Sequence, residues 1–148
     1  MVLPLLTRID HVGIACRDLD RAVELYQATF GLEVASLEVN EEQGVREAML
    51  AVGGSPASGD RPGYVQLLEP LSPDTPVGRF IARRGEGLHH VGYGVADIGT
   101  TLAAIGGAGI RLIDERPRHG SMGASIAFLH PGDLGGVLTE LVQFVSPA

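Results

Sequence analysis

The sequence contains a single cysteine and no tryptophan, and aromatic residues make up only 5% of its 148 positions. One cysteine excludes an intramolecular disulfide, and its apolar neighbours indicate a small buried side chain rather than a nucleophile. No apolar run approaches the roughly 20 residues that a membrane-spanning helix requires. The opening segment, MVLPLLTR, lacks the basic region and the cleavage site of a secretory signal. We therefore expect a cytoplasmic protein that does not bind membranes.

Basic residues are also scarce. Lys and Arg number 11 against 18 Asp and Glu, which gives a formal net charge of -7. Such an acidic protein repels phosphate backbones, so nucleic acid is not an expected partner. With 45% hydrophobic residues, the chain is rich enough in apolar side chains to fold as one domain over residues 1–148.

The chain repeats itself. The run IDHVGIACRDLD, from Ile9, matches LHHVGYGVADIG, from Leu88, at an offset of 79 residues. Each run alternates like a strand and then passes through an aspartate, Asp18 or Asp97, that can cap a helix. The sequence thus predicts two similar halves, each beginning with a strand and a helix.

The remaining pattern completes both halves. Apolar spacing predicts helices over 19–30 and from Asp97 toward Gly109, and a linker helix capped by Asp74 or Thr75. Strands are expected near 32–40, 45–52 and 64–69 in the first half, and near 110–114, 124–129 and 137–144 in the second. Residues 53–63 are expected to form a loop.

These elements predict an α+β fold of two tandem βαβββ modules that form one curved eight-stranded sheet with helices outside. Module 1 spans about 7–71, the linker helix about 74–85 and module 2 about 86–146.

Four polar residues occupy equivalent places in the two halves. His11 and His90 share their strand faces with small residues, which leaves room for a ligand. Gln66 and Glu140, 74 residues apart, each interrupt an apolar strand. Any one of them alone would be interpreted as a hydrogen-bonded polar residue at a strand edge. Four at matching places favour a site for a divalent ion, with Co²⁺, Ni²⁺, Zn²⁺, Mn²⁺ and Fe²⁺ all compatible with two His, one Gln oxygen and one Glu.

A fifth residue breaks the symmetry. Glu47 lies in a predicted strand where its counterpart in the second half is Ile126. It is either a solvated strand residue or a carboxylate poised as a general base. His89, next to His90 but on the other face, is expected to pack rather than bind metal.

The chain resembles the vicinal oxygen chelate superfamily, which includes glyoxalase I and extradiol dioxygenases, and within it the methylmalonyl-CoA epimerase family. The runs that carry this resemblance cover almost the whole chain: RIDHVGIACRDLDRAVELYQATFGLE, EEQGVREAML, LLEPLSPDTPVGRFIARRGEGLHHVGYGV, LIDERPRHG, IAFLHP and GGVLTELVQF. The sequence departs from many relatives at Met122-Gly123, where they have Gly-Gly.

The resemblance implies a metal cup inside the curved sheet, with His11, Gln66, His90 and Glu140 as ligands of one divalent ion, expected to be Co²⁺. It implies an isomerase that interconverts the R and S epimers of methylmalonyl-CoA at C2, by proton abstraction to a metal-stabilised enolate, and that forms a homodimer. Glu47 matches the family's catalytic glutamate. We further hypothesise that Glu140, dissociating from the metal or using a bound water, is the proton donor on the opposite face of the substrate.

Two other functions remain open from the sequence, and a third is disfavoured. A glyoxalase-type lyase or isomerase would use the same cup, and a metal-free small-molecule binding protein would keep the fold. An extradiol dioxygenase, which uses two His and one carboxylate, is disfavoured because Gln66 would be a fourth protein ligand.

Overall fold

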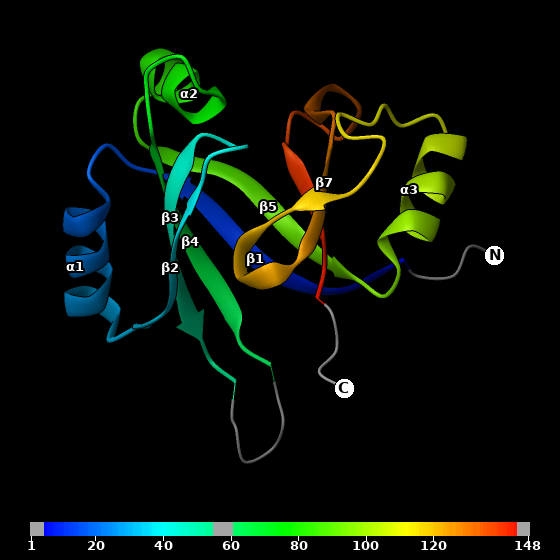
Figure 1. The fold of residues 1–148 in the computed structure, drawn as a ribbon. Coiled ribbons are helices and arrows are strands. Elements are labelled where there is room, and N and C mark those ends of the chain that lie inside the picture. Colours follow the sequence, from blue (N-terminus) through cyan, green and yellow to red (C-terminus); the bar gives the residue numbers. More distant parts are fainter. Residues whose placement is uncertain (1–4, 55–60, 145–148) are drawn as a thin grey trace. The chain divides into compact units, whose positions relative to one another are not determined.

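A computed structural model describes residues 5–54 and 61–144 of the chain (Figure 1). Parts of the predicted loop 53–63 and both ends of the predicted domain lie outside these residues. The elements, in chain order, are β1 (Leu6–Ala15), α1 (Leu19–Phe30), β2 (Glu33–Asn40), β3 (Val45–Val52), β4 (Gly63–Pro70), α2 (Pro76–Arg84), β5 (Gly87–Val95), α3 (Ile98–Gly107), β6 (Arg118–His119), β7 (Ser125–Leu129) and β8 (Thr139–Gln143). In the described ranges, no helix is long and apolar enough to cross a membrane.

The chain divides into two compact units. One is His11–His89, and the other joins Met1–Asp10 to His90–Ala148. In the first unit the strand order is β2-β3-β4-β1, and β1 runs parallel to β4. In the second the order is β5-β8-β7-β6, and β5 runs parallel to β8. The two orders are the same when each strand is matched by its place in the repeat, which confirms the α+β fold of two tandem βαβββ modules.

The first strand contributes to both units. From His11 onward, β1 pairs with β4. Before that point, the side chains of Thr7 and Arg8 lie against Gly94 of β5, where an added Cβ would come within 2.6 Å of the Arg8 side chain. Gly94 therefore admits the first half of β1 into the second unit.

The predicted aspartates cap the helices. Asp18 accepts a hydrogen bond from the Arg21 N–H at the start of α1, and Asp97 accepts one from Thr100 at the start of α3. The helix α1 ends at Gly31, whose φ of 70° is the left-handed conformation that glycine adopts without steric cost. For α2, Thr75 rather than Asp74 provides the side-chain cap.

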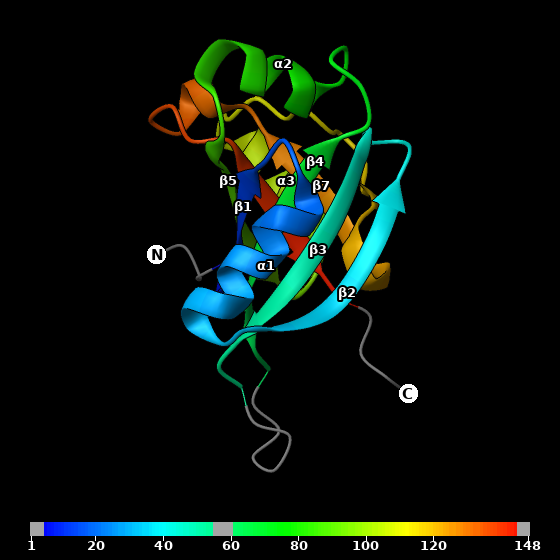
Figure 2. The ribbon, with the colours of Figure 1, turned by 90° about the vertical axis from the view of Figure 1, so that its left-hand side faces the viewer.

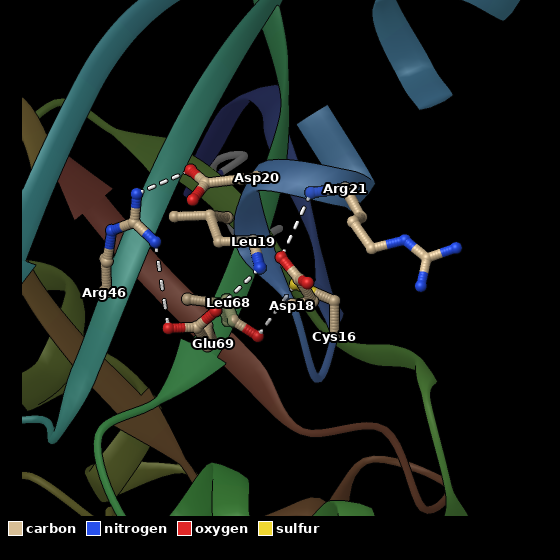
Figure 3. Close-up of polar contacts among 8 residues, drawn as sticks. All are labelled: Cys16, Asp18, Leu19, Asp20, Arg21, Arg46, Leu68 and Glu69. Carbon is tan, nitrogen blue, oxygen red and sulfur yellow. Dashed lines mark hydrogen bonds and ion pairs between the residues drawn. The ribbon is translucent and has the colours of Figure 1, made fainter. Parts of the chain in front are cut away.

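At the start of α1 and of α3, a second side chain accepts a backbone hydrogen bond, and it comes from the last strand of the same module. Glu69 on β4 accepts from the Leu19 N–H at 2.7 Å (Figure 3), and Gln143 on β8 accepts from the Ile98 N–H at 2.8 Å. Glu69 also lies 3.9 Å from Arg46 on β3. Each module therefore ties its helix to its own strands through one polar side chain.

Each module's helix covers one face of that module's strands, as Figure 2 shows for α1. Under α1 the buried cluster contains Leu19, Leu50 and Leu67, together with Cys16. Under α3 the buried cluster contains Leu102, Leu129 and Leu141, among others. The expectation that Cys16 is a core residue is confirmed, since it is 5% exposed.

The strand predicted near 110–114 was wrong. Only Leu112 makes an isolated bridge, to Leu129. The Asp114 carboxylate accepts from the Phe128 N–H at 2.9 Å, so a side chain takes the donor that a strand's backbone would use. The two-residue β6, Arg118–His119, pairs with β7 instead.

Candidate functional site

In each module the first strand pairs with the last strand, and this pairing places a histidine beside a polar residue in the same way in both modules. On β1, His11 lies two residues before Gly13, which is in register with Gln66 on β4. On β5, His90 lies two residues before Gly92, which is in register with Glu140 on β8. Residues two apart share a face of a strand, so each histidine is a diagonal neighbour of the polar residue.

In the unit that contains 90–148, this register brings two ligand-type side chains together. The His90 Nε2 and Glu140 Oε2 atoms are 4.0 Å apart. The two residues are only 3% and 4% exposed. The His90 ring packs edge-on against Phe128, which is directly opposite Glu140 on the neighbouring strand. The Phe128 ring thus packs against the imidazole on the side where the Glu140 carboxylate lies.

In the unit 11–89, Gln66 meets Glu47. The Gln66 Nε2 atom donates a hydrogen bond to Glu47 Oε2 at 2.9 Å. Glu47 is 2% exposed and Gln66 5% exposed. The alternative that Glu47 is a solvated strand residue is therefore wrong. His11, in the same unit, is 3% exposed.

The other histidines have different surroundings. His89 packs edge-on against Phe80, as expected, and burial lowers its pKa to about 4, so its ring is neutral at physiological pH. His130 uses its Nδ1 to accept a hydrogen bond from Gly132 N–H. His119 is exposed on β6.

The donor chemistry fits a divalent ion. Two atoms that bind one ion at about 2.1 Å lie roughly 3 to 4 Å from each other, as His90 and Glu140 do. A carboxylate as buried as Glu140 is strongly destabilising unless a cation or several donors compensate its charge. Imidazole nitrogen with carboxylate oxygen suits the first-row ions named above better than Ca²⁺ or Mg²⁺.

Sequence reasoning found the individual residues but missed the direct bond between Glu47 and Gln66. It also missed the helix-capping role of Glu69 and Gln143. The sequence did contain a signal for the capping role, because Glu69 and Gln143 are 74 positions apart, the same offset that relates Gln66 to Glu140. The bond between Glu47 and Gln66 depends on the register of β3 on β4, which the repeat does not specify.

Comparison with known proteins gives a consistent result. The family model of the Glyoxalase/Bleomycin resistance protein/Dioxygenase superfamily matches residues 10–128. A solved structure of a variant of Streptomyces coelicolor methylmalonyl-CoA epimerase, in complex with 2-nitronate-propionyl-CoA, is similar to this chain. Its TM-score is 0.90 and its identity 53%, and the match covers 95% of this chain and 99% of that one.

Two curated relatives agree. The mitochondrial methylmalonyl-CoA epimerase of Bos taurus is 33% identical over 139 residues, which are 93% of this chain and 75% of the relative. The ethylmalonyl-CoA/methylmalonyl-CoA epimerase of Cereibacter sphaeroides is 32% identical over 138 residues, 92% of this chain and 97% of the relative. The chain therefore belongs to the Glyoxalase/Bleomycin resistance protein/Dioxygenase superfamily and, within it, to the methylmalonyl-CoA epimerase family of isomerases.

Proposed function

We propose that this protein interconverts the R and S epimers of methylmalonyl-CoA at C2. The observation that carries the proposal is the burial of Glu47, a carboxylate held by Gln66 where the other module has the apolar Ile126. A buried carboxylate in this position can act as the general base that removes the C2 proton from one face of the substrate. The epimerase relatives support the choice of substrate.

The metal centre is part of the proposal. His11, His90 and Glu140 are buried, and each offers a ligand atom that could hold a metal ion. With Gln66 they complete the four ligands predicted from the repeat, and Co²⁺ is the proposed ion. When bound, a divalent ion would supply Lewis-acid stabilisation for the negative charge that develops on the substrate as the C2 proton leaves.

Proton transfer falls to the two glutamates. Glu47 is proposed to take the C2 proton on one face, a step in which a positioned general base typically contributes about 10²- to 10⁴-fold in rate. Glu140, or a water that it holds, is proposed to serve the opposite face. The hydrogen bond from Gln66 keeps the Glu47 carboxylate in a fixed orientation for this step.

Two further expectations belong to the same proposal. The protein is proposed to work as a homodimer in the cytoplasm, like an ordinary metabolic enzyme. Light scattering during gel filtration measures the molar mass in solution and so tests the dimer. One chain has a mass of 15.5 kDa, and a dimer should have twice that mass. A single species at the monomer mass would remove it.

The first experiment follows the C2 proton. In D₂O, the methyl doublet of methylmalonyl-CoA should collapse as C2 takes up deuterium when the Co²⁺-loaded protein is present. The chelated protein should lose most of this activity. Glu47→Gln, which keeps the size of the side chain but cannot act as a base, should slow the exchange at least 100-fold.

Three outcomes would count against the proposal. Absence of exchange with every divalent ion would remove the epimerase assignment and favour the glyoxalase-type alternative, which a methylglyoxal–thiol hemithioacetal would then test. Full exchange by Glu47→Gln would show that another residue is the base. Exchange of the C2 proton of ethylmalonyl-CoA but not of methylmalonyl-CoA would show that the proposed substrate is wrong.

A further inference from the structure

Glu47 has a second relationship to the site besides its proposed role as base. Its partner, Gln66, carries an amide, whose two ends differ chemically. The oxygen can bind a divalent ion, whereas the NH₂ group can only donate hydrogen bonds. A half-turn about the last bond of the side chain exchanges the two ends, so the amide must be oriented before it can act as a ligand.

A hydrogen bond to Glu47 orients the Gln66 amide. Gln66 Nε2 donates to Glu47 Oε2 at 2.9 Å, which directs the nitrogen end of the amide to Glu47 and makes the oxygen the end that is turned elsewhere. In the reversed orientation the amide oxygen would face the oxygens of a carboxylate, and two acceptors repel each other. Both residues are at least 95% buried, so water does not weaken this preference.

Strand register explains why Glu47 can reach the amide. On the antiparallel pair β3 and β4, Glu47 is directly opposite Leu68, and Gln66 lies two residues before Leu68 on the same face. Glu47 and Gln66 are thus diagonal neighbours, a separation that two long side chains span.

The other module shows the complementary arrangement. There Ile126 is directly opposite Val142, and Glu140 lies two residues before Val142. Ile126 therefore occupies the place of Glu47, and Glu140 the place of Gln66. A carboxylate has two equivalent oxygens, so Glu140 needs no partner to orient it, and an apolar residue suffices beside it.

We propose, on the basis of the proposed metal site, that Glu47 is a positioning residue for the metal ligand Gln66 as well as the base. The break in the repeat then follows from ligand chemistry: the module with an amide ligand carries the orienting carboxylate, and the module with a carboxylate ligand does not. Loss of such an outer partner typically weakens metal binding 10- to 100-fold.

Calorimetric titration of the metal-free protein with Co²⁺ tests the two roles separately. Glu47→Leu removes the acceptor and should weaken Co²⁺ binding about tenfold or more. Glu47→Gln retains an oxygen that can accept from the Gln66 amide, so Co²⁺ should bind within about threefold of the wild type even though proton exchange is lost. Far-UV circular dichroism verifies that each variant is folded.

A double variant provides the decisive rescue. In Glu47→Leu/Gln66→Glu, the ligand has equivalent oxygens and no orienting partner, like the pair Ile126 and Glu140, so Co²⁺ affinity should return to near the wild-type value. Any folding damage caused by the Glu47→Leu substitution would persist in the double variant. Gln66→Glu alone measures how much affinity a carboxylate ligand adds over an amide by its charge, and only the rescue beyond that gain counts as evidence for positioning.

The outcomes separate this inference from the proposed function. If Glu47→Leu binds Co²⁺ as tightly as the wild type, or the double variant is no tighter than Glu47→Leu, the positioning role is wrong, whatever the wild-type exchange rate. If the predicted affinities are found but no protein exchanges the C2 proton, the positioning role stands and the epimerase proposal fails. A wild-type protein that does not bind Co²⁺ would overturn the inference together with the metal site.

Discussion

Burial and three nearby carboxylates all raise the pKa of the Cys16 thiol. Burial, then the nearby charges of Glu69, Glu86 and Asp18, raise the pKa of the thiol to about 12. The thiol lies 3.5 Å from the Leu68 carbonyl oxygen, to which it donates (Figure 3). Cys16 also belongs to the buried cluster under α1. Only the thiolate is a nucleophile, so this residue should be chemically inert in the folded protein.

We therefore expect Cys16 to resist alkylation. At pH 8, a pKa of about 12 leaves roughly one thiol in ten thousand as thiolate, against about one in four for a free cysteine of pKa about 8.5. Iodoacetamide labelling, followed by mass spectrometry, should thus be at least 100-fold slower for the native protein than in guanidinium chloride. Equal rates in the two conditions would mean that the thiol is accessible and ionised.

At the level of the elements, the last strand of each module carries two polar residues with different tasks. One face of β4 presents Gln66, and three residues later Glu69 accepts from the start of α1. On β8 the identities are exchanged, since Glu140 takes the first place and Gln143 the second. The neutral Gln143 shows that the cap needs an acceptor oxygen rather than a negative charge.

This exchange predicts the effect of substitutions at Glu69. Glu69→Gln keeps an acceptor for the Leu19 N–H and should change the free energy of unfolding by less than about 0.5 kcal/mol. Glu69→Ala leaves that N–H without its acceptor and should cost about 1 kcal/mol, the usual effect of losing a helix cap. Urea denaturation measures both. Equal losses in the two variants would indicate that the ion pair with Arg46, rather than the cap, is responsible.

Most of these helices and strands could be predicted from the sequence, because the repeat allows each element assigned in one half to be compared with its counterpart in the other half. The strand, aspartate cap and helix seen at Asp18 recur at Asp97, and the structure has both. The pattern failed at 110–114, where the Asp114 side chain takes the Phe128 N–H. Local apolar alternation cannot reveal such competition between a side chain and the backbone. The bond between Glu47 and Gln66 was inaccessible for a similar reason, since it depends on strand register.

At the scale of the whole molecule, the proposed ligands His11, Gln66, His90 and Glu140 are spread along the chain from the first strand to the last. Any ion that binds the native state and not the unfolded chain stabilises the former by mass action. The proposed site therefore makes the stability of the entire chain depend on the concentration of the metal ion.

Co²⁺ at 100 times its dissociation constant should raise the free energy of unfolding by about 2.7 kcal/mol. Differential scanning calorimetry with increasing Co²⁺ measures the corresponding rise in Tm. His90→Ala, which removes one proposed ligand, should show little of the rise. A similar rise in this variant would mean that Co²⁺ binds elsewhere on the acidic surface.

The placement of the first half of β1 in the same compact unit as the strands that follow His90 has a consequence for biosynthesis. A ribosome delivers the chain from its N-terminus, so all of His11–His89 emerges before the segment His90–Ala148 does. That continuous unit can fold during translation. Thr7 and Arg8, by contrast, must wait for Gly94, so the first strand is completed by a segment from the second half of the chain.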